Sequence, residues 1–355
     1  MHALKHTIVH MKKGELNNSR GKEAGILYRI MALPAWASVI IALAAALLVA
    51  VLAETIFNRF TRKAFKPAGK HCFVTGGSTG LGKALAIELV KKGANVTIVA
   101  RRQSELDKAA KEIEANKVND SQRVVTVSAD MTCDADVLRA FDEAKVKMDG
   151  DPEIVCACAG AAYPKLFVDH TVEDFEYLSK LNYLGQVYVA HQATLRMREA
   201  GIKDGKIVFV SSMAGLIGIA GYAAYAPTKF ALRGLADSLR NELKMYNIDV
   251  HIYLPGNIDT PGFETENLTK PKVTRIIEGP SVPVSPVDCA KSLIKGLEAG
   301  KYMITNEFIA EVLRSATRGV NPSNNFILDS LMAIVGQPVG SIYALYMDYV
   351  VKHTK

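Results

Sequence analysis

Short apolar runs alternate with amphipathic segments between residues 71 and 305, and this alternation limits the possible folds more than any other feature. "HCFVTG" (71–76), "NVTIVA" (95–100) and "GKIVFVSS" (205–212) are typical of the seven runs. Strands so uniformly apolar are buried on both faces, and the helical segments between them supply the cover. The pattern predicts an α/β fold, with a doubly wound parallel sheet over residues 68–305.

A run of 23 residues without a charge, Met31 to Ala53, precedes this domain. As a helix it would be about 34 Å long, enough to cross the hydrocarbon core of a bilayer. A cleaved signal peptide is a weaker alternative because its apolar region is shorter and begins closer to the N-terminus. A buried helix is the other alternative. We expect a polar tail (1–30), a transmembrane anchor (31–53) and a basic linker (54–67).

Composition and charge exclude several classes of partner. The net charge of +7 is spread along the chain and aromatic residues make up only 7%, so we expect no nucleic-acid partner. Basic residues flank the apolar run on both sides, so charge gives no membrane orientation.

The five cysteines are too few for a disulfide framework. Cys156 and Cys158 share one face of a strand, where a metal or redox pair competes with two small buried residues. We interpret all five as free thiols, which favours a reducing compartment, and expect no metal site.

The segment "TGGSTGLG" (75–82) lies between the first strand and its helix, where a doubly wound fold binds a dinucleotide. Glycine lets the backbone approach a phosphate closely, and the amides that open the helix point a positive dipole at it. Tight packing of helix on strand also uses glycine, but the position after the first strand favours a cofactor. We predict cofactor contacts from Gly76, Ser78, Thr79, Gly80, Leu81 and Gly82.

The end of the second strand discriminates between the two nicotinamide dinucleotides. Folds that bind NAD usually have an acidic residue there, which bonds the ribose hydroxyls. Here Ala100 is followed by Arg101 and Arg102. An acidic side chain repels a 2′-phosphate, whereas arginine binds one through two parallel donors. Arginines at helix starts are often inert, yet the missing acid predicts NADPH, with Arg101 at its phosphate.

An ordered set of motifs resembles the short-chain dehydrogenase/reductase family. The TGxxxGxG motif of that family is matched at 75–82, and its Tyr-x3-Lys pair is matched by Tyr225 and Lys229. Its serine corresponds to Ser212 in "VSSMAG", and its helix asparagine to Asn182 in "LNYLG". The resemblance covers the whole predicted sheet and implies a Rossmann fold and a nicotinamide-dependent oxidoreductase. A packed tyrosine beside a solvated lysine is the alternative, but it requires four coincidences in register.

Ketone reduction explains why a tyrosine and a lysine stand four residues apart. The carbonyl carbon takes a hydride, and its oxygen takes a proton that Tyr225 can donate, although a free phenol has a pKa of about 10. Lys229 lies on the same helical face, so we expect its charge, with that of the oxidised cofactor, to lower this pKa. The resemblance further implies that Tyr225 and Lys229 contact the cofactor, with Lys229 on the nicotinamide ribose. It implies that Ser212 holds the substrate oxygen and that Asn182 holds a helix and a water in the proton relay.

The resemblance extends to two more positions and fails at two others. It implies that Asp130 bonds the adenine amino group and that Thr260, in "PGNIDT", bonds the nicotinamide amide, although either is also a common turn residue. The NNAG motif of the family is "ACAG" here, so Cys158 replaces an asparagine that braces the sheet. Pro227 lies inside the Tyr-x3-Lys segment, which is tolerable only if Tyr225 belongs to the first turn of its helix.

The predicted substrate pocket is apolar. The residues after Ser212, "MAGLIGIAGY", are mostly small and include no arginine or lysine to hold a carboxylate or phosphate. The segment 261–284 has the composition of a mobile lid, in which Glu264 or Glu266 could attract an amine, although solvated acids are common in lids. An apolar pocket in an anchored enzyme predicts a lipid-like ketone as substrate.

Longer stretches, including "NYLGQVYV" and "DTPGFETEN", resemble the 3-ketodihydrosphingosine reductases, especially the anchored fungal form. That resemblance implies NADPH-dependent reduction of 3-dehydrosphinganine to sphinganine in sphingolipid biosynthesis. It also implies the endoplasmic reticulum membrane, with the catalytic domain facing the cytosol. A reductase of steroids or retinoids would share every catalytic residue. A non-catalytic membrane scaffold that binds NADPH would be expected to lack Tyr225 or Lys229, and both are present.

The C-terminal segment carries a second apolar run. Between Asp329 and Asp348 lie 18 uncharged residues interrupted by "GQPVG", too broken for a predicted span. The run could lie in the membrane interface, dip into the bilayer, or pack on the core or on a second subunit of a homo-oligomer. Its tyrosines favour interfacial contact. We expect residues 306–355 to form a membrane-associated extension.

Overall fold

The computed structural model describes residues 34–62, 65–280 and 282–354. The chain divides into two units, one up to Phe57 and one from Asn58 onward, and each is considered separately. The polar tail predicted at 1–30 lies outside the described residues.

The apolar run near the N-terminus forms one long helix, α3 (Ala35–Thr61). Its segment Trp36–Asn58 has a mean hydropathy of 2.7, and none of it is buried in the protein. The length and composition of this helix suffice to cross a membrane and fit a membrane association. The helix continues past Ala53 because no glycine or proline interrupts the sequence there, so the first part of the linker expected at 54–67 is helical.

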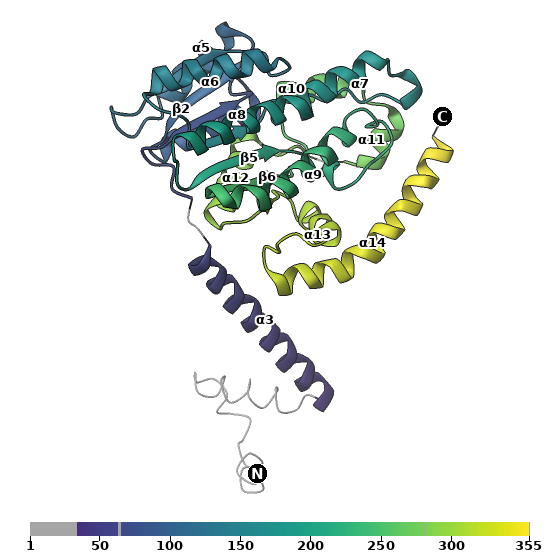
Figure 1. The fold of residues 1–355 in the computed structure, drawn as a ribbon. Helices are drawn as coiled ribbons and strands as arrows, with labels where there is room; N and C mark the ends of the chain where they lie inside the picture. Colours follow the sequence, from purple (N-terminus) through teal and green to yellow (C-terminus); the bar gives the residue numbers. More distant parts are fainter. Residues whose placement is uncertain (1–33, 63–64, 281, 355) are drawn as a thin grey trace, which may run out of the picture. The chain divides into compact units, whose positions relative to one another are not determined.

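Seven parallel strands form one sheet, in the order β3-β2-β1-β4-β5-β6-β7. The alternation of apolar runs predicts this parallel sheet, whose strands are drawn as arrows in Figure 1. The chain moves outward from β1 to β3 and then returns to begin β4 on the other side of β1. This reversal opens a crevice at the carboxyl ends of β1 and β4, where doubly wound folds bind their ligands. The strands are β1 (His71–Thr75), β2 (Asn95–Ala100), β3 (Val124–Ser128), β4 (Ile154–Ala157), β5 (Gly205–Val210), β6 (Ile248–Tyr253) and β7 (Met303–Ile304).

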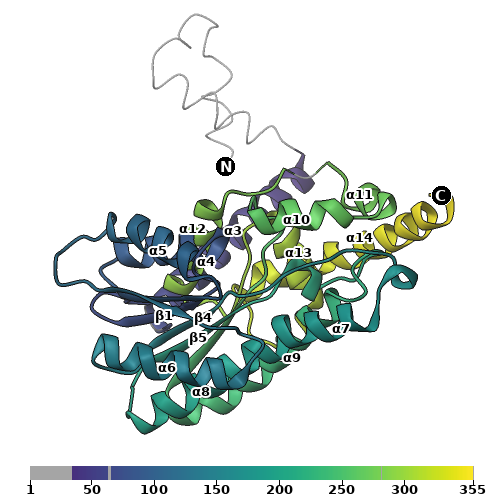
Figure 2. The same cartoon turned by 90° about the horizontal axis from the view of Figure 1, so that it is seen from above.

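Helices cover both faces of the sheet, as Figure 2 shows. One face carries α4 (Gly80–Lys91), α5 (Gln103–Glu114) and α12 (Pro286–Glu298), whose apolar residues join one core cluster. The other face carries α6 (Asp134–Met148), α8 (Gly185–Glu199) and α9 (Ala226–Glu242), which build a second cluster. The sheet residues between the two layers are almost all buried, which explains their uniform apolarity.

Short elements surround the carboxyl edge of the sheet. They are α7 (Val172–Leu178), a π-helical turn (Ser179–Leu184), α10 (Pro261–Thr269), α11 (Lys272–Glu278), and the 3₁₀ turns Phe167–Asp169 and Met213–Gly215. A third 3₁₀ turn, Leu243–Tyr246, joins α9 to the start of β6 at the opposite edge. The segment predicted as a lid therefore folds largely as two short helices. Two further helices, α13 (Phe308–Thr317) and α14 (Phe326–His353), follow the last strand.

The predicted interruption of the C-terminal apolar run at "GQPVG" is wrong. The helix α14 continues through Pro338 for 28 residues, and its mean hydropathy is 1.3. Gly336 explains part of this, because a β-carbon there would lie 3.0 Å from Ala316 Cβ of α13. The glycine thus lets α14 pack closely against α13 at the position where the sequence suggested a break. By length and composition, α14 is a second helix that fits a membrane association.

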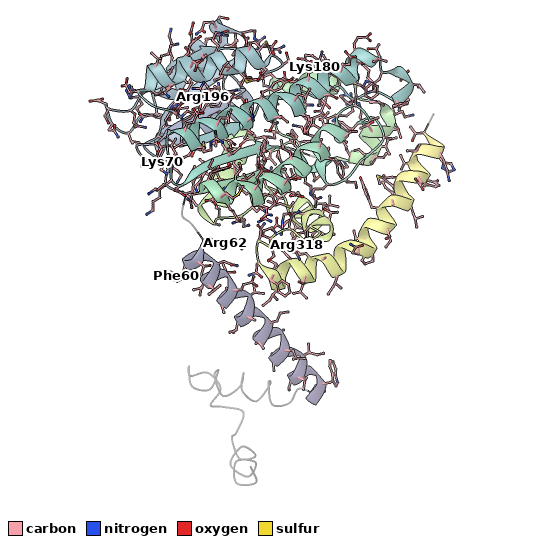
Figure 3. The ribbon with its side chains drawn as sticks, in the orientation of Figure 1. Phe60, Arg62, Lys70, Lys180, Arg196 and Arg318 are labelled. Atoms are coloured by element: carbon pink, nitrogen blue, oxygen red, sulfur yellow. The ribbon has the colours of Figure 1, made fainter. Side chains whose placement is uncertain are left out.

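A buried ion pair fixes the turn between α13 and α14. The guanidinium of Arg314, fully buried, donates to both carboxylate oxygens of Asp329 at 2.5 and 3.0 Å and also to Glu311. Arg62, labelled in Figure 3, donates to the backbone carbonyls of Ser323 and Asn324 in the same turn. These bonds fix α13 and α14 relative to each other and anchor the turn between them to Arg62.

Replacing Asp329 should destabilise the fold. The variant Asp329→Ala leaves one side of a buried guanidinium unpaired, and we expect it to lower the free energy of unfolding by about 3 kcal/mol. Denaturant titration of the full chain in detergent micelles measures the change. Asp348→Ala, on an exposed position of the same helix, is the matched control and should change stability little. Equal stability of the two variants would show that the ion pair does not hold the extension.

Candidate active site

One cavity of about 1030 Å³ opens at the carboxyl edge of the sheet. Its walls come from the turn after β1, the ends of β2 to β6, the start of α9, the helices α10 and α11, and the C-terminal helices α13 and α14. Of the residues predicted to form the site, all but Asn182 line it: Gly76, Ser78, Thr79, Gly80, Leu81, Gly82, Arg101, Asp130, Ser212, Tyr225, Lys229 and Thr260.

The turn after β1 forms a cradle of backbone. Gly80 opens α4 with a φ of +53°, and a β-carbon there would lie 2.9 Å from Thr260 Cγ2. A β-carbon at Gly82 would overlap the carbonyl oxygen of Gly76. The N-cap residue, Thr79, makes no side-chain bond to the first amides of the helix, which therefore remain available to a ligand. A diphosphate fits such a turn in chemistry and in space.

The end of β2 presents positive charge to the same cavity. Arg101 and Arg102 are exposed and line the cavity. Ala100, the last residue of β2, is also part of the cavity wall. Arg101 Nη1 donates to the Tyr177 hydroxyl at 3.3 Å, which orients one edge of the guanidinium and leaves donors on the other. This arrangement fits an anionic group on the ribose of a dinucleotide.

Two predicted cofactor contacts also have local bonding roles. The carboxylate of Asp130 accepts hydrogen bonds from the amide and hydroxyl of Thr132, both at 2.9 Å. The hydroxyl of Thr260 accepts from the amide of Phe263 at 3.1 Å and so caps α10. Both side chains still line the cavity, so these bonds fix their positions beside any ligand there.

Tyr225 stands at the N-cap of α9, as the position of Pro227 requires. Pro227 occupies the first turn of this helix, where an amide has no intrahelical partner to lose. One turn later, Lys229 is only 4% exposed and its Nζ lies 5.5 Å from the centroid of the Tyr225 ring. The ammonium donates to the carbonyl of Val210 at 3.1 Å, which fixes it beneath the tyrosine.

The protein environment alone shifts the protonation of this pair. Burial raises the pKa of Tyr225, and the charge of Glu266 raises it further, whereas a hydrogen bond with Ser212 lowers it. Burial also lowers the pKa of Lys229 to about 8, against an opposing effect of Cys158. Desolvation therefore opposes the lowered phenol pKa that we expect from Lys229 together with the oxidised cofactor, and that expectation stays a prediction for the enzyme with cofactor bound. A protonated phenol is the form that can donate a proton to a ketone oxygen.

Asn182 holds the wall of the cavity without lining it. It lies in the π-helical turn, a distortion that often marks functional positions, and is fully buried. Its side chain accepts from the amide of Ala161 and donates to the carbonyl of Ala161, both at 2.9 Å. It thereby fixes the loop after β4.

Cys158 takes the place of the bracing asparagine, and Thr75 supplies bonds near it. The Thr75 hydroxyl accepts from the amides of Cys158 and Ala159 at 3.0 and 3.1 Å, which joins the ends of β1 and β4. All five cysteines are free thiols. Burial raises the pKa of Cys158 to about 12, so it is not a reactive thiolate.

Sequence reasoning missed most of a polar cluster in the cavity wall. Tyr222 lies between the carboxylates of Glu266 and Glu278, which both also contact Lys270. Of these four, only Glu266 was singled out. Tyr222 is one turn before Tyr225, but no local pattern predicts that α11 brings Glu278 to it. The contribution of α13 and α14 to the cavity was also missed.

Comparison with known proteins agrees with the fold and the motifs. Residues 70–271 match the family described as short chain dehydrogenase. The 3-ketodihydrosphingosine reductase TSC10 of Cryptococcus neoformans is 40% identical over 311 residues, which cover 87% of this chain and 92% of that protein. The 3-ketodihydrosphingosine reductase of Bos taurus is 39% identical over 307 residues, 86% of this chain and 91% of the relative. The 3-dehydrosphinganine reductase of Danio rerio is 39% identical over 285 residues, 80% and 85% of the two chains. The chain therefore belongs to the short-chain dehydrogenase family, as an oxidoreductase that uses a nicotinamide cofactor and is related to the 3-ketodihydrosphingosine reductases of fungi and animals.

Proposed function

We propose that this enzyme reduces 3-ketodihydrosphingosine to sphinganine with NADPH in sphingolipid synthesis. One observation carries the proposal beyond the similarity of sequence: a single cavity contains the proton-donating group and an apolar wall. Ser212, Tyr225 and Lys229 lie in that cavity, and α13 and α14 contribute Ile309, Val312, Leu313 and Val339 to it. A ketone that carries a long aliphatic chain needs both features. The carbonyl needs a proton donor, and burial of the chain against an apolar wall provides most of the binding energy.

The residues of the chain divide the chemistry in a defined way. The bound cofactor supplies the hydride that reaches the carbonyl carbon. Tyr225 donates its phenolic proton to the carbonyl oxygen, which becomes the hydroxyl of the product. Ser212 bonds the same oxygen and orients it towards Tyr225. Lys229, buried beside the ring, stabilises the phenolate that remains, and Asn182 keeps the loop at Ala161 in place for reprotonation from water.

The choice of NADPH rests on charge at the end of β2. Arg101 and Arg102 line the cavity there, and neither Ala100 nor Gln103 on either side of them carries a carboxylate that would repel a 2′-phosphate. Asp130 and Thr260 are proposed to contact the adenine amino group and the nicotinamide amide, and the turn from Gly76 to Gly82 the diphosphate.

The enzyme is proposed to act at the endoplasmic reticulum membrane, with its catalytic domain facing the cytosol. Two apolar helices support a membrane association, and the free thiols support a reducing compartment. The proposed membrane contacts are a span by α3 and interfacial contact by α14.

The activity is tested with the full chain in detergent micelles, by following NADPH oxidation. We expect turnover of 3-ketodihydrosphingosine and not of a ketosteroid or retinal. The variant Tyr225→Phe should lose at least about 100-fold in kcat because it has no proton to donate. Tyr246→Phe, which lies outside the cavity wall, is the matched control. Turnover of steroid or retinal alone would keep the mechanism and reject the substrate, and an active Tyr225→Phe would reject the mechanism.

Cofactor preference is tested by Arg101→Ala. Loss of a charge-assisted contact to the 2′-phosphate should raise the KM for NADPH by about ten-fold or more and leave the KM for NADH unchanged. Arg198→Ala, an exposed position on α8, controls for general loss of positive charge. An equal effect of Arg101→Ala on both cofactors would contradict the assignment, as would a wild-type preference for NADH.

Topology is tested by glycosylation. The sequences "NNS" at Asn17 and "NLT" at Asn267 are acceptor sites on opposite sides of the anchor. In microsomes we expect Asn267 to remain unmodified and any glycan to be on Asn17, as read from the shift after endoglycosidase treatment of Asn17→Gln and Asn267→Gln variants. A glycan on Asn267 would place the catalytic domain in the lumen.

A further inference from the structure

A compact group of charged and polar side chains lies beside Tyr225, and the chemistry of the hydride and proton transfer does not use it. The Tyr222 hydroxyl is 2.5 Å from Glu266 Oε1 and 2.7 Å from Glu278 Oε1. The Nζ of Lys270 is 3.1 Å from Glu266 Oε1 and 2.8 Å from Glu278 Oε2. The Lys270 side chain is only 2% exposed, so this is a buried network and not a solvated surface.

The network is one positive charge short. Among the residues that the structure describes, two carboxylates face one ammonium, and their other side-chain partner, Tyr222, is neutral. Its hydroxyl has a single proton, so it can donate to only one of the two carboxylate oxygens that it contacts. The nearby Arg275 donates to the backbone carbonyls of Asn267 and Lys270, and so does not neutralise the carboxylates directly. An excess negative charge in a partly buried site is costly unless a cation pairs with it.

The unbalanced charge faces the cavity. Tyr222, Glu266 and Glu278 all line it, and the Glu266 side chain keeps 15% of its surface exposed. Within the described part of the chain, Glu266 Oε1 receives both contacts and Oε2 receives no hydrogen bond. The Tyr222 and Tyr225 rings lie 5.8 Å apart between centroids, so the carboxylates are one side chain away from the proton donor. The effect of Glu266 on the pKa of Tyr225 reflects the same proximity.

The proposed substrate carries a cation where this network could pair with it. In 3-ketodihydrosphingosine a primary amine is bonded to the carbon next to the carbonyl carbon. The amine nitrogen is therefore about 2.5 Å from the carbon that receives the hydride, by standard bond lengths and angles. With the ketone oxygen at Ser212 and Tyr225, an amine directed towards the neighbouring Tyr222 ring would come close to this network.

We propose that the cavity holds an ammonium subsite in which Glu266 binds the protonated amine of the substrate. Tyr222, Lys270 and Glu278 position the Glu266 carboxylate; α10 carries Glu266, α11 carries Glu278, and Lys270 lies between these two helices. The subsite selects aliphatic ketones with an amine adjacent to the carbonyl. This inference deepens the proposed function and rests on it.

The test compares two ketones on the full chain in detergent micelles with NADPH. One is 3-ketodihydrosphingosine and the other is its analogue without the amine, of the same chain length. The wild type should favour the amine-bearing ketone by about ten- to a hundred-fold in kcat/KM, as expected for a hydrogen bond between charged groups. Glu266→Gln should abolish this preference, because kcat/KM should fall for the amine-bearing ketone. Glu264→Gln, exposed on the same helix, should keep the wild-type preference.

Each outcome separates the subsite from the reductase activity. Turnover of the analogue by Glu266→Gln shows that the variant is folded and binds cofactor, so a collapsed preference then supports the subsite. A wild type that reduces both ketones equally well overturns the subsite and leaves the reductase function intact. A preference that survives in Glu266→Gln also overturns it. A wild type that reduces neither ketone, while still binding NADPH, overturns the proposed function and the subsite with it.

Discussion

The parallel pairing of β1 with β4 is the constraint on which the rest of the structure depends. Because β4 begins on the opposite side of β1 from β2, the helices that follow the two strands leave on opposite faces of the sheet and leave a crevice between them. Thr75 closes the bottom of that crevice by bonding the amides of Cys158 and Ala159. Because all the strands are parallel, their carboxyl ends lie at the same edge of the sheet. Residues as distant in sequence as Gly76 and Glu307 therefore line one cavity.

The same enclosure sets the electrostatics of the site. Removing water disfavours the charged forms of both Tyr225 and Lys229, so burial alone moves the phenol and the ammonium towards neutrality. In the proposed mechanism of ketone reduction this favours the first step, because Tyr225 must be protonated to act as the acid. Burial is unfavourable at the second step, because the phenolate that then remains is charged. A positive charge must then be close, and Lys229 is the cation that the fold holds beside the ring.

The sequence predicted those parts of the molecule that local patterns encode. Apolar strands and the spacing of Gly76, Gly80 and Gly82 report short-range constraints, so the sheet and the tight turn after its first strand could be predicted. The pairing of Tyr222 with Glu278 depends on how α11 packs, and no periodicity records it. The desolvation that raises the pKa of Tyr225 could not be read from the sequence for a related reason, because it depends on how the folded cavity encloses the ring. Likewise, "GQPVG" suggested a break in isolation, whereas contact with α13 makes Gly336 a packing position.

The lid segment 261–284 and the C-terminal extension together make one part of the cavity wall charged and another part apolar. Lid residues Glu266 and Glu278 place negative charge on one part of the wall, and Val312 and Val339 from α13 and α14 make another part apolar. A ketone with an amine on one side of the carbonyl and a long alkyl chain on the other can satisfy both parts in only one orientation. That orientation also decides which face of the carbonyl meets the cofactor. Arg314 and Asp329 fix α13 against α14, and so hold in place the helices that carry Val312 and Val339. The extension is therefore expected to affect the stereochemistry of the product as well as the stability of the fold.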